Sequence, residues 1–225
     1  MKRVNIAIDG PAGAGKSTVA RKVASILGYV YVDTGAMYRA VTWMALKRGI
    51  DLQDSARIIE MAQKLDIVLL PGEASQIVLV NNEDVTDPIR TNEVSTTVSH
   101  IAQIPEIREL LVRFQKRMAE DKGVVMDGRD IGTHVLPDAE VKVFLTASVR
   151  RRAERRRLEL LARGDDIPLE QLEREIAARD KLDSERSVSP LVRADDAVLL
   201  DCSNLGIDEV IERILILCRA KINED

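Results

Sequence analysis

Residues 10–17 read Gly10-Pro11-Ala12-Gly13-Ala14-Gly15-Lys16-Ser17, a glycine-rich run that ends in Lys-Ser. The Gly-x-x-x-x-Gly-Lys-Ser pattern lets the backbone curl until successive N–H groups point inward at phosphate oxygens. A short apolar segment, residues 4–8, precedes the stretch, and an amphipathic pattern from residue 17 to about residue 27 follows it. This order predicts a strand, a phosphate-binding loop and a helix whose N-terminus favours an anion.

The loop is therefore expected to hold the phosphates of ATP. Lys16 would neutralise charge on the β- and γ-phosphates, and the Ser17 hydroxyl would be a ligand of Mg²⁺. The predicted ATP-binding residues are Gly10, Pro11, Ala12, Gly13, Ala14, Gly15, Lys16, Ser17 and Thr18. Because the backbone groups of the loop bind phosphates and not the base, the loop leaves the choice between ATP and GTP open.

Further strands are expected at residues 29–32, 124–126, 141–145 and 197–200, which are short, apolar and bounded by Asp, Gly or Pro. Together with residues 4–8 they predict a five-stranded parallel sheet with helices on both faces, an α/β fold. Between residues 65 and 90, short apolar runs are separated by Pro71-Gly72 and Asn81-Asn82. These turn signals predict a small antiparallel insertion.

Composition narrows the class of protein. Of 225 residues, 45% are hydrophobic and 31% charged, which is typical of a globular protein. A net charge of -4 and 3% aromatic residues argue against nucleic-acid binding. We expect no membrane association, because no apolar run approaches about 20 residues, and a cytoplasmic location, because Met1-Lys2-Arg3 leads directly into the first strand. Cys202 and Cys218 are expected to be ordinary buried thiols.

Two further motifs follow predicted strands. Residues 33–39 read Asp33-Thr34-Gly35-Ala36-Met37-Tyr38-Arg39, and residues 127–133 read Asp127-Gly128-Arg129-Asp130-Ile131-Gly132-Thr133. Hydroxyl, aromatic, guanidinium and carboxylate groups are thus placed at the carboxyl ends of strands, where open α/β sheets bind ligands. The Asn-Lys-x-Asp element with which regulatory GTPases read guanine does not occur in the sequence. An acceptor pocket is favoured.

The sequence resembles the bacterial cytidylate kinases, a family of nucleoside monophosphate kinases. The resemblance extends over the whole chain and rests on the phosphate-binding loop, residues 33–39, Ile89-Arg90-Thr91 with Glu93-Val94, residues 127–133 and residues 179–190. It implies one P-loop kinase domain with a core of residues 1–33, 105–149 and 187–225 and a monophosphate-binding region of about 34–104, which holds the insertion at about 65–90. It also implies a mobile arginine-rich lid at about 150–166 and a helical segment, 167–186, that contributes to the acceptor site.

The resemblance also implies the substrates CMP or dCMP and ATP, and a monomer is expected. Arg39, Arg129 and Arg186 match ligands of the acceptor phosphate, with Tyr38 beside them, and guanidinium groups suit a phosphate dianion. Asp130 matches the acceptor for the amino group of cytosine, which uracil lacks. The predicted CMP-binding residues are Thr34, Tyr38, Arg39, Ser99, Arg108, Arg129, Asp130, Arg179, Asp183 and Arg186, where Arg179 and Asp183 match contacts to the sugar and Ser99 and Arg108 contacts to the base.

Transfer to a phosphate oxygen that is already ionised needs no general base, so we expect catalysis by positioning and charge stabilisation. The predicted catalytic residues are Lys16, Arg129, Arg155 and Arg157, the last two chosen from six arginines between positions 150 and 157. Two alternatives stay open here: another small-molecule P-loop kinase, for example for UMP or AMP, and a regulatory protein that senses nucleotides without transfer. The sequence does not decide between CMP and dCMP.

Overall fold

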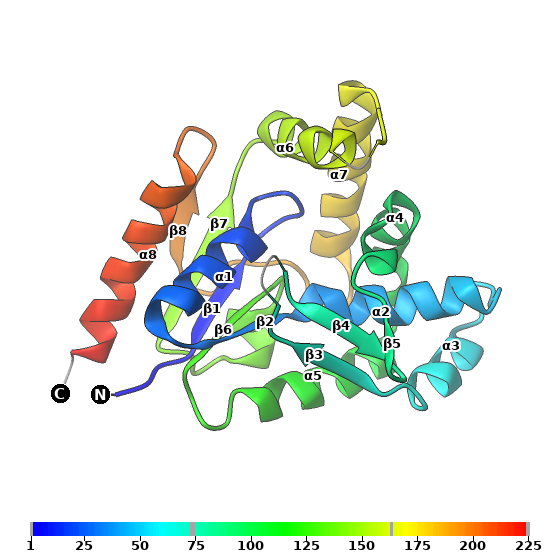
Figure 1. Ribbon diagram of the computed structural model, residues 1–225, viewed down its shortest axis with the longest axis horizontal. Helices are drawn as coiled ribbons and strands as arrows, with labels where there is room; N and C mark the ends of the chain where they lie inside the picture. The colour runs from blue at the N-terminus through cyan, green and yellow to red at the C-terminus, as the bar shows by residue number, and fades with distance from the viewer. Residues whose placement is uncertain (1, 73–74, 163, 224–225) are drawn as a thin grey trace. The chain divides into compact units, whose positions relative to one another are not determined.

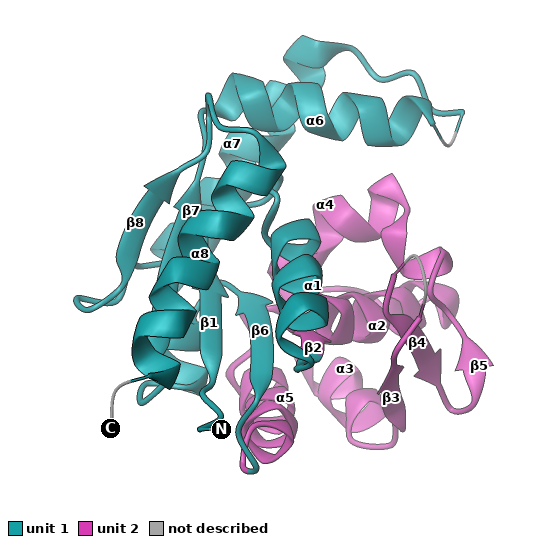
Figure 2. Cartoon of the chain, turned by 60° about the vertical axis from the view of Figure 1, so that its left-hand side comes forward, with its two compact units in different colours: residues 1–30, 121–225 teal, residues 31–120 magenta. Residues whose placement is uncertain are grey.

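The computed structural model of the protein describes residues 2–72, 75–162 and 164–223. Glu73 and Ala74 of the predicted insertion and Arg163 of the predicted lid lie outside the described residues. The chain divides into two compact units, residues 1–30 with 121–225 and residues 31–120 (Figure 2). The division into core, monophosphate-binding region and lid stays a prediction.

A five-stranded sheet has the strand order β2-β6-β1-β7-β8 (Figure 1). Its strands are β1 (Ile6–Asp9), β2 (Val30–Asp33), β6 (Val124–Gly128), β7 (Val141–Thr146) and β8 (Val198–Asp201). β1 lies parallel between β6 and β7, with Ile6 opposite Val125 and Val141, and β8 runs parallel to β7. Every residue of β1 and β6 is buried, which explains their continuous apolar sequence. The predicted five-stranded parallel sheet is confirmed.

Two helices of the first unit pack on this sheet and on each other. α1 (Lys16–Leu27) contacts β1 and β6, and α8 (Ile207–Ile222) contacts β7 and α1. α1 ends at Leu27 and is capped by Gly28, which has a left-handed φ of 65° and whose N–H faces the carbonyls of Ala24 and Ser25. Because β1 and α1 are both fixed by burial, the loop between them is held at both of its ends.

A second helix pair lies in the same unit. α6 (Val149–Leu161) and α7 (Leu169–Glu185) pack against each other through the buried side chains of Ala153, Leu160, Leu172 and Ile176. Ser148 begins α6 because its hydroxyl accepts a hydrogen bond from the amide of Arg151. The arginine-rich segment is therefore helical and is joined to the helix that carries residues 179–185.

The second unit is built around α2 (Thr34–Lys47), which contacts α3 (Ser55–Ala62), α4 (Asn92–Ile101) and α5 (Pro105–Met118). Asp33 caps α2 by accepting the amide of Ala36 at 2.8 Å. The unit has its own apolar core, whose buried members include Met37, Val41, Ile58, Val78, Ile89, Ile107 and Leu111.

The insertion forms a separate antiparallel sheet of β3 (Ile67–Leu70), β4 (Ile77–Val80) and β5 (Glu83–Asp84). Asn81 and Asn82, with φ angles of 51° and 65°, form the two-residue turn between β4 and β5. Two successive positive φ angles are what a type I′ hairpin requires, and Asn tolerates them. The predicted antiparallel insertion is confirmed.

Candidate active site

The phosphate-binding loop requires glycine at its first position. Gly10 has a φ of +146°, and a Cβ atom added there would lie 1.9 Å from the carbonyl oxygen of Leu145 in β7. Gly15, with a φ of 93°, is the left-handed residue from which α1 begins. The tight curl of the loop thus depends on residues that have no side chain, and it sets the loop amides at the N-terminus of α1.

Lys16 is buried at the base of this loop. Its Nζ donates to the carbonyl of Pro11 at 2.9 Å, and the residue is 5% exposed. Burial, and then the positive charge of Arg129, lower the pKa of Lys16 to about 7, although Asp127 and Asp9 act in the opposite direction. A phosphate beside the ammonium would supply the negative charge that this buried cation needs.

Ser17 and Asp127 meet at the end of β6. The Ser17 hydroxyl donates to Asp127 Oδ2 at 2.9 Å, and Asp127 is 4% exposed. A hydroxyl and a carboxylate beside a phosphate loop are the oxygen ligands that P-loop enzymes offer to Mg²⁺. Among the described residues there is no group of three or more His, Cys, Asp or Glu side chains that could hold a metal without further ligands.

The carboxyl end of β6 and the C-terminal end of α7 bring together five of the predicted acceptor residues. Arg129 Nε donates to Asp183 Oδ2 at 2.9 Å, and Arg179 Nε lies 4.0 Å from the same oxygen. Arg186 Nη2 lies 3.5 Å from Asp130 Oδ1. The structure therefore joins residues that are about 50 positions apart in sequence into one cluster of three guanidinium groups and two carboxylates.

The cluster contains one more guanidinium group than carboxylate groups. Burial would raise the pKa of Asp183, but the guanidinium groups of Arg129 and Arg179 hold it below its usual range. Asp183 therefore stays ionised and fixes the arginines around it. α7 ends at Glu185, so Arg186 reaches the cluster from an extended residue just after the helix and not, as predicted, from its last turn.

Asp9 holds the segment that follows Asp130. Its two carboxylate oxygens accept the amides of Ile131 and Gly132 at 2.8 and 2.7 Å, at the start of a single π-helical turn, Ile131–Val135. Burial raises the pKa of Asp9 to about 6, although these two hydrogen bonds lower it. Sequence reasoning assigned no role to Asp9 and missed this contact.

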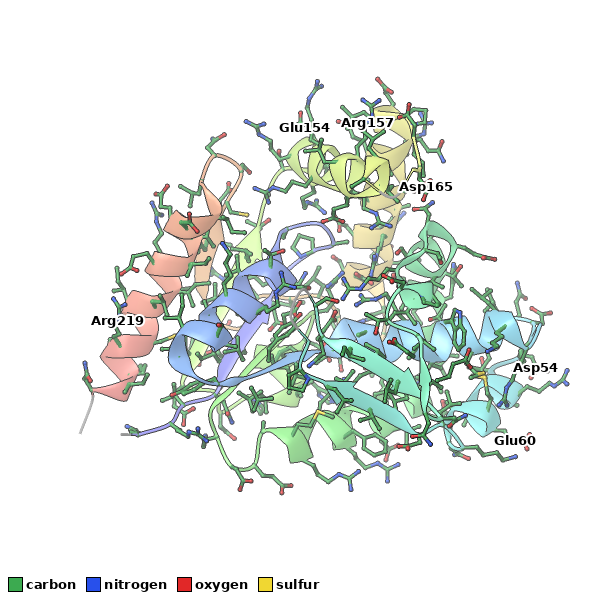
Figure 3. All side chains as sticks on the ribbon, in the orientation of Figure 1. Asp54, Glu60, Glu154, Arg157, Asp165 and Arg219 are labelled. Atoms are coloured by element: carbon green, nitrogen blue, oxygen red, sulfur yellow. The ribbon has the colours of Figure 1, made fainter. Side chains whose placement is uncertain are left out.

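The two lid arginines chosen from the sequence differ in their surroundings. Arg155 Nη1 donates to the carbonyl of Ala14 in the phosphate-binding loop at 3.2 Å, and its Nη2 donates to the carbonyl of Cys202 at 2.8 Å. Arg157 pairs with Asp166 at 3.2 Å, and its side chain is 42% exposed. Figure 3 labels Arg157 on α6, one turn after Glu154. Their part in phosphoryl transfer stays a prediction.

The other five predicted acceptor residues belong to the second unit. Arg39 Nη2 donates to Asp33 Oδ2 at 2.7 Å beside Thr34, which is buried. The Arg108 guanidinium lies 5.5 Å from the centre of the Tyr38 ring, and Arg108 is 2% exposed. Ser99, on α4, is buried as well. Five of the ten predicted acceptor residues thus belong to each unit.

Burial would raise the pKa of Asp33, but the charges of Arg39 and Arg90 lower it below the usual value. Arg90, from the Ile89-Arg90-Thr91 motif, therefore belongs to the same charged group as Arg39. The ionised Asp33 has two roles, because one of its oxygens caps α2 while the other holds Arg39.

Gln76 is a further residue that sequence reasoning missed. Its side-chain oxygen accepts the amide of Asp33 at 3.0 Å, and its side-chain nitrogen donates to the carbonyl of Tyr31 at 2.6 Å. Gln76 precedes β4 and is 7% exposed. The antiparallel insertion therefore contributes to the site by holding the end of β2.

A family model described as cytidylate kinase matches residues 6–220. The chain belongs to the cytidylate kinase family. The resemblance predicted from the motifs is therefore confirmed. Within this family, the chain is 58% identical over 214 residues to the cytidylate kinase of Exiguobacterium sibiricum, a match that covers 95% of this chain and 96% of that one. It is 56% identical over 214 residues to the cytidylate kinase of Bacillus thuringiensis, with 95% of each chain covered.

A likeness to a solved structure supports the fold of this cytidylate kinase family member. An uncharacterized protein from Eubacterium ventriosum superposes with a TM-score of 0.54 at 11% identity, covering 97% of this chain and 99% of that one. At this identity the likeness concerns the fold alone. Within the part of the chain that the structure describes, no helix is both long and apolar enough to cross a membrane.

Proposed function

We propose that this protein transfers the γ-phosphoryl group of ATP to CMP or dCMP and releases ADP with CDP or dCDP. The observation that carries the proposal is the membership of residues 6–220 in the cytidylate kinase family. The phosphate-binding loop of the first unit and the arginine cluster beside Asp130 supply chemistry that suits this reaction. We further propose that the enzyme acts in the cytoplasm as a monomer.

On the donor side, the loop amides and Lys16 would hold the β- and γ-phosphates of ATP. Ser17 and Asp127, 2.9 Å apart through Oγ and Oδ2, would hold Mg²⁺ together with phosphate oxygens. When bound, Mg²⁺ neutralises charge that develops between the two phosphates. Asp127 thereby extends the metal site that the sequence assigned to Ser17 alone.

On the acceptor side, Arg129 and Arg186 of the first unit and Arg39 of the second would bind the phosphate of CMP. Their carboxylate partners, Asp183, Asp130 and Asp33, hold the guanidinium groups in place before the substrate arrives. Planar guanidinium groups that are already oriented lose little side-chain entropy when they bind a dianion. The base would be read by Asp130 with Ser99 and Arg108, and the sugar by Arg179 and Asp183.

The reaction needs no proton acceptor of its own, because the attacking oxygen of the CMP phosphate is ionised at neutral pH. The chain contributes by positioning the two phosphates, by directing Lys16 and Arg129 at the charge of the transferred group, and by excluding water. Among the lid arginines, Arg155 is the better candidate for a direct role, because it already lies at the loop carbonyl of Ala14.

A phosphorylation assay over a panel of nucleoside mono- and triphosphates tests the proposal. The expected result is ADP release with ATP and Mg²⁺ when CMP or dCMP is present, and little release with UMP or AMP. Failure to release ADP with either cytidine nucleotide would contradict the kinase function and favour a protein that only senses nucleotides. Rapid turnover of UMP or AMP would favour a kinase of other specificity.

The specificity assignment is tested by Asp130→Asn. We expect the ratio of kcat/KM for CMP over UMP to fall by about tenfold or more, because the neutral amide no longer selects the amino group of cytosine. Asp138→Asn is the matched control, since Asp138 is exposed in the next loop. An unchanged ratio in Asp130→Asn would remove Asp130 from base recognition.

A further inference from the structure

Arg152 donates hydrogen bonds from all three nitrogens of its guanidinium group. It lies in the first turns of α6, and its side chain is only 5% exposed. Nε donates to the carbonyl of Ala147 at 2.9 Å, Nη1 to the carbonyl of Ala12 at 3.0 Å, and Nη2 to Asp180 Oδ2 at 2.6 Å. One guanidinium group therefore connects three segments of the first unit: the end of β7, the phosphate-binding loop and α7.

At the loop, Arg152 contacts a backbone carbonyl group. For the loop amides to point inward, its carbonyl groups must find partners elsewhere. Arg152 donates a hydrogen bond to the carbonyl of Ala12. Arg155 and the Cys202 thiol both donate to the carbonyl of Ala14, at 3.2 Å each. A Cβ atom at Gly13 would lie 3.1 Å from the Cβ of Arg152, so α6 packs directly on the loop.

At α7, Arg152 holds the residue next to the acceptor cluster. Asp180 follows Arg179 and lies almost one turn before Asp183, and its side chain is 22% exposed. The partner of this carboxylate is the buried Arg152. Asp180 Oδ1 is buried and has no hydrogen-bond partner among the described residues. The rotation of α7 about its axis, which directs Arg179 and Asp183, is therefore linked to the loop through one ion pair.

We propose that Arg152 and Asp180 form a positioning pair that couples binding at the donor loop to binding at the acceptor cluster. The pair touches neither reacting group. An ATP that tightens the loop fixes Arg152, Arg152 fixes Asp180, and α7 then presents its arginines to CMP. The inference rests on the proposed function, because it takes the loop and the α7 cluster as the two nucleotide sites. Coupling of this kind acts equally in both directions.

The test measures dissociation constants for the full-length protein by isothermal titration calorimetry. A non-hydrolysable ATP analogue with Mg²⁺ is titrated without and with saturating CMP, and CMP without and with saturating analogue. In the wild type we expect each nucleotide to tighten the other by about fivefold or more, by the same factor in both orders. Equal affinities with and without the second nucleotide would overturn the proposal, whereas no binding of CMP at all would overturn the proposed function.

Asp180→Asn removes the charge at constant size, and Arg152→Lys removes the forked geometry. Both variants are expected to reduce the coupling factor below about twofold, whatever happens to the individual affinities. Glu154→Gln is the matched control, because it removes the partner of an exposed arginine on the same helix, Arg151, and should keep the wild-type factor. If one of the two variants does not fold, the coupling factor of the other variant tests the proposal. A folded variant that melts at a lower temperature but keeps the wild-type factor would show a purely structural pair and overturn the proposal.

Discussion

Asp9 Oδ2 accepts the amide of Gly132 at 2.7 Å and so joins the strand before the phosphate-binding loop to the turn after Asp130. Burial raises the pKa of Asp9 from 3.8 to about 6. Between these two pH values the folded protein keeps a proton that the unfolded chain has released. The free energy of unfolding therefore falls as the pH rises through this window, by up to about 3 kcal/mol, and stays lower above it.

Asp9→Asn should abolish most of this dependence, since an amide does not titrate. The measurement is the free energy of unfolding from urea titrations at several pH values between 4 and 7. Asp138→Asn, at an exposed position, should keep the wild-type slope. The assignment to Asp9 is wrong if Asp9→Asn and the wild type show the same slope.

We expect the amine of Lys16 to take up a proton when a nucleotide binds. Its pKa of about 7 in the nucleotide-free protein leaves the amine mostly neutral at pH 8, and phosphate oxygens would restore the charge. We therefore expect net proton uptake at pH 8 when the nucleotide binds. Calorimetry of ATP-analogue binding in two buffers of different ionisation enthalpy measures this uptake.

In that experiment, two variants distinguish proton uptake by Lys16 from proton uptake by other groups. Lys16→Arg keeps its charge at every accessible pH and should take up almost no proton. Lys22→Met removes an exposed lysine that pairs with Asp208 and should behave as the wild type. Uptake that persists in Lys16→Arg would assign the proton to another residue.

Gly10→Ala should destabilise the protein by about 2 kcal/mol or more, because the added methyl group meets a backbone carbonyl that cannot move independently of β7. Gly206→Ala is the control, since no atom lies within 4 Å of its added Cβ and its φ of -69° suits any residue. We expect it to cost less than about 1 kcal/mol. Chemical denaturation measures the unfolding free energy of both variants. Equal losses of stability would show that position 10 tolerates a side chain.

Gln76→Leu should weaken the binding of CMP but not that of ATP. The change removes both side-chain hydrogen bonds and leaves the amide of Asp33 and the carbonyl of Tyr31 without these partners, at about 1–3 kcal/mol for each buried group. We expect the KM for CMP to rise by about fivefold or more, which corresponds to about 1 kcal/mol, while the KM for ATP changes little. Gln171→Leu, which alters an exposed glutamine on α7, should change neither. Equal effects on both KM values would argue against a local role for Gln76.

Patterns local in sequence predicted most of the fold. The strands of the parallel sheet have continuous apolar runs because both of their faces are buried, and the Asn81-Asn82 hairpin has its own turn chemistry. The cluster around Asp183 could be anticipated because Arg179 and Asp183 are four positions apart on one helix. In these cases the residues that interact are close in sequence, or their spacing follows the repeat of a helix or a strand.

The contacts that sequence reasoning missed join residues that are far apart in the chain. Asp9 and Gly132 are 123 positions apart, and Ser17 and Asp127 are 110 apart. Gln76 stands before an apolar strand without any motif, and Arg152 is one of several adjacent arginines with the same local sequence. Only the folded chain shows which arginine reaches Ala12 and which one reaches Asp166.

Both natural thiols, Cys202 and Cys218, are buried, and burial raises the pKa of Cys218 to about 12. Neither should react quickly with maleimide, because Cys202 is shielded by burial and the raised pKa of Cys218 disfavours its reactive thiolate. Fluorophores can therefore be attached selectively at introduced surface cysteines without removing the natural ones. Glu60 on α3 and Arg219 on α8, both labelled in Figure 3, are in different units, and each forms an exposed ion pair. A donor and an acceptor dye at these two positions would report the distance between the units in solution, with and without nucleotides.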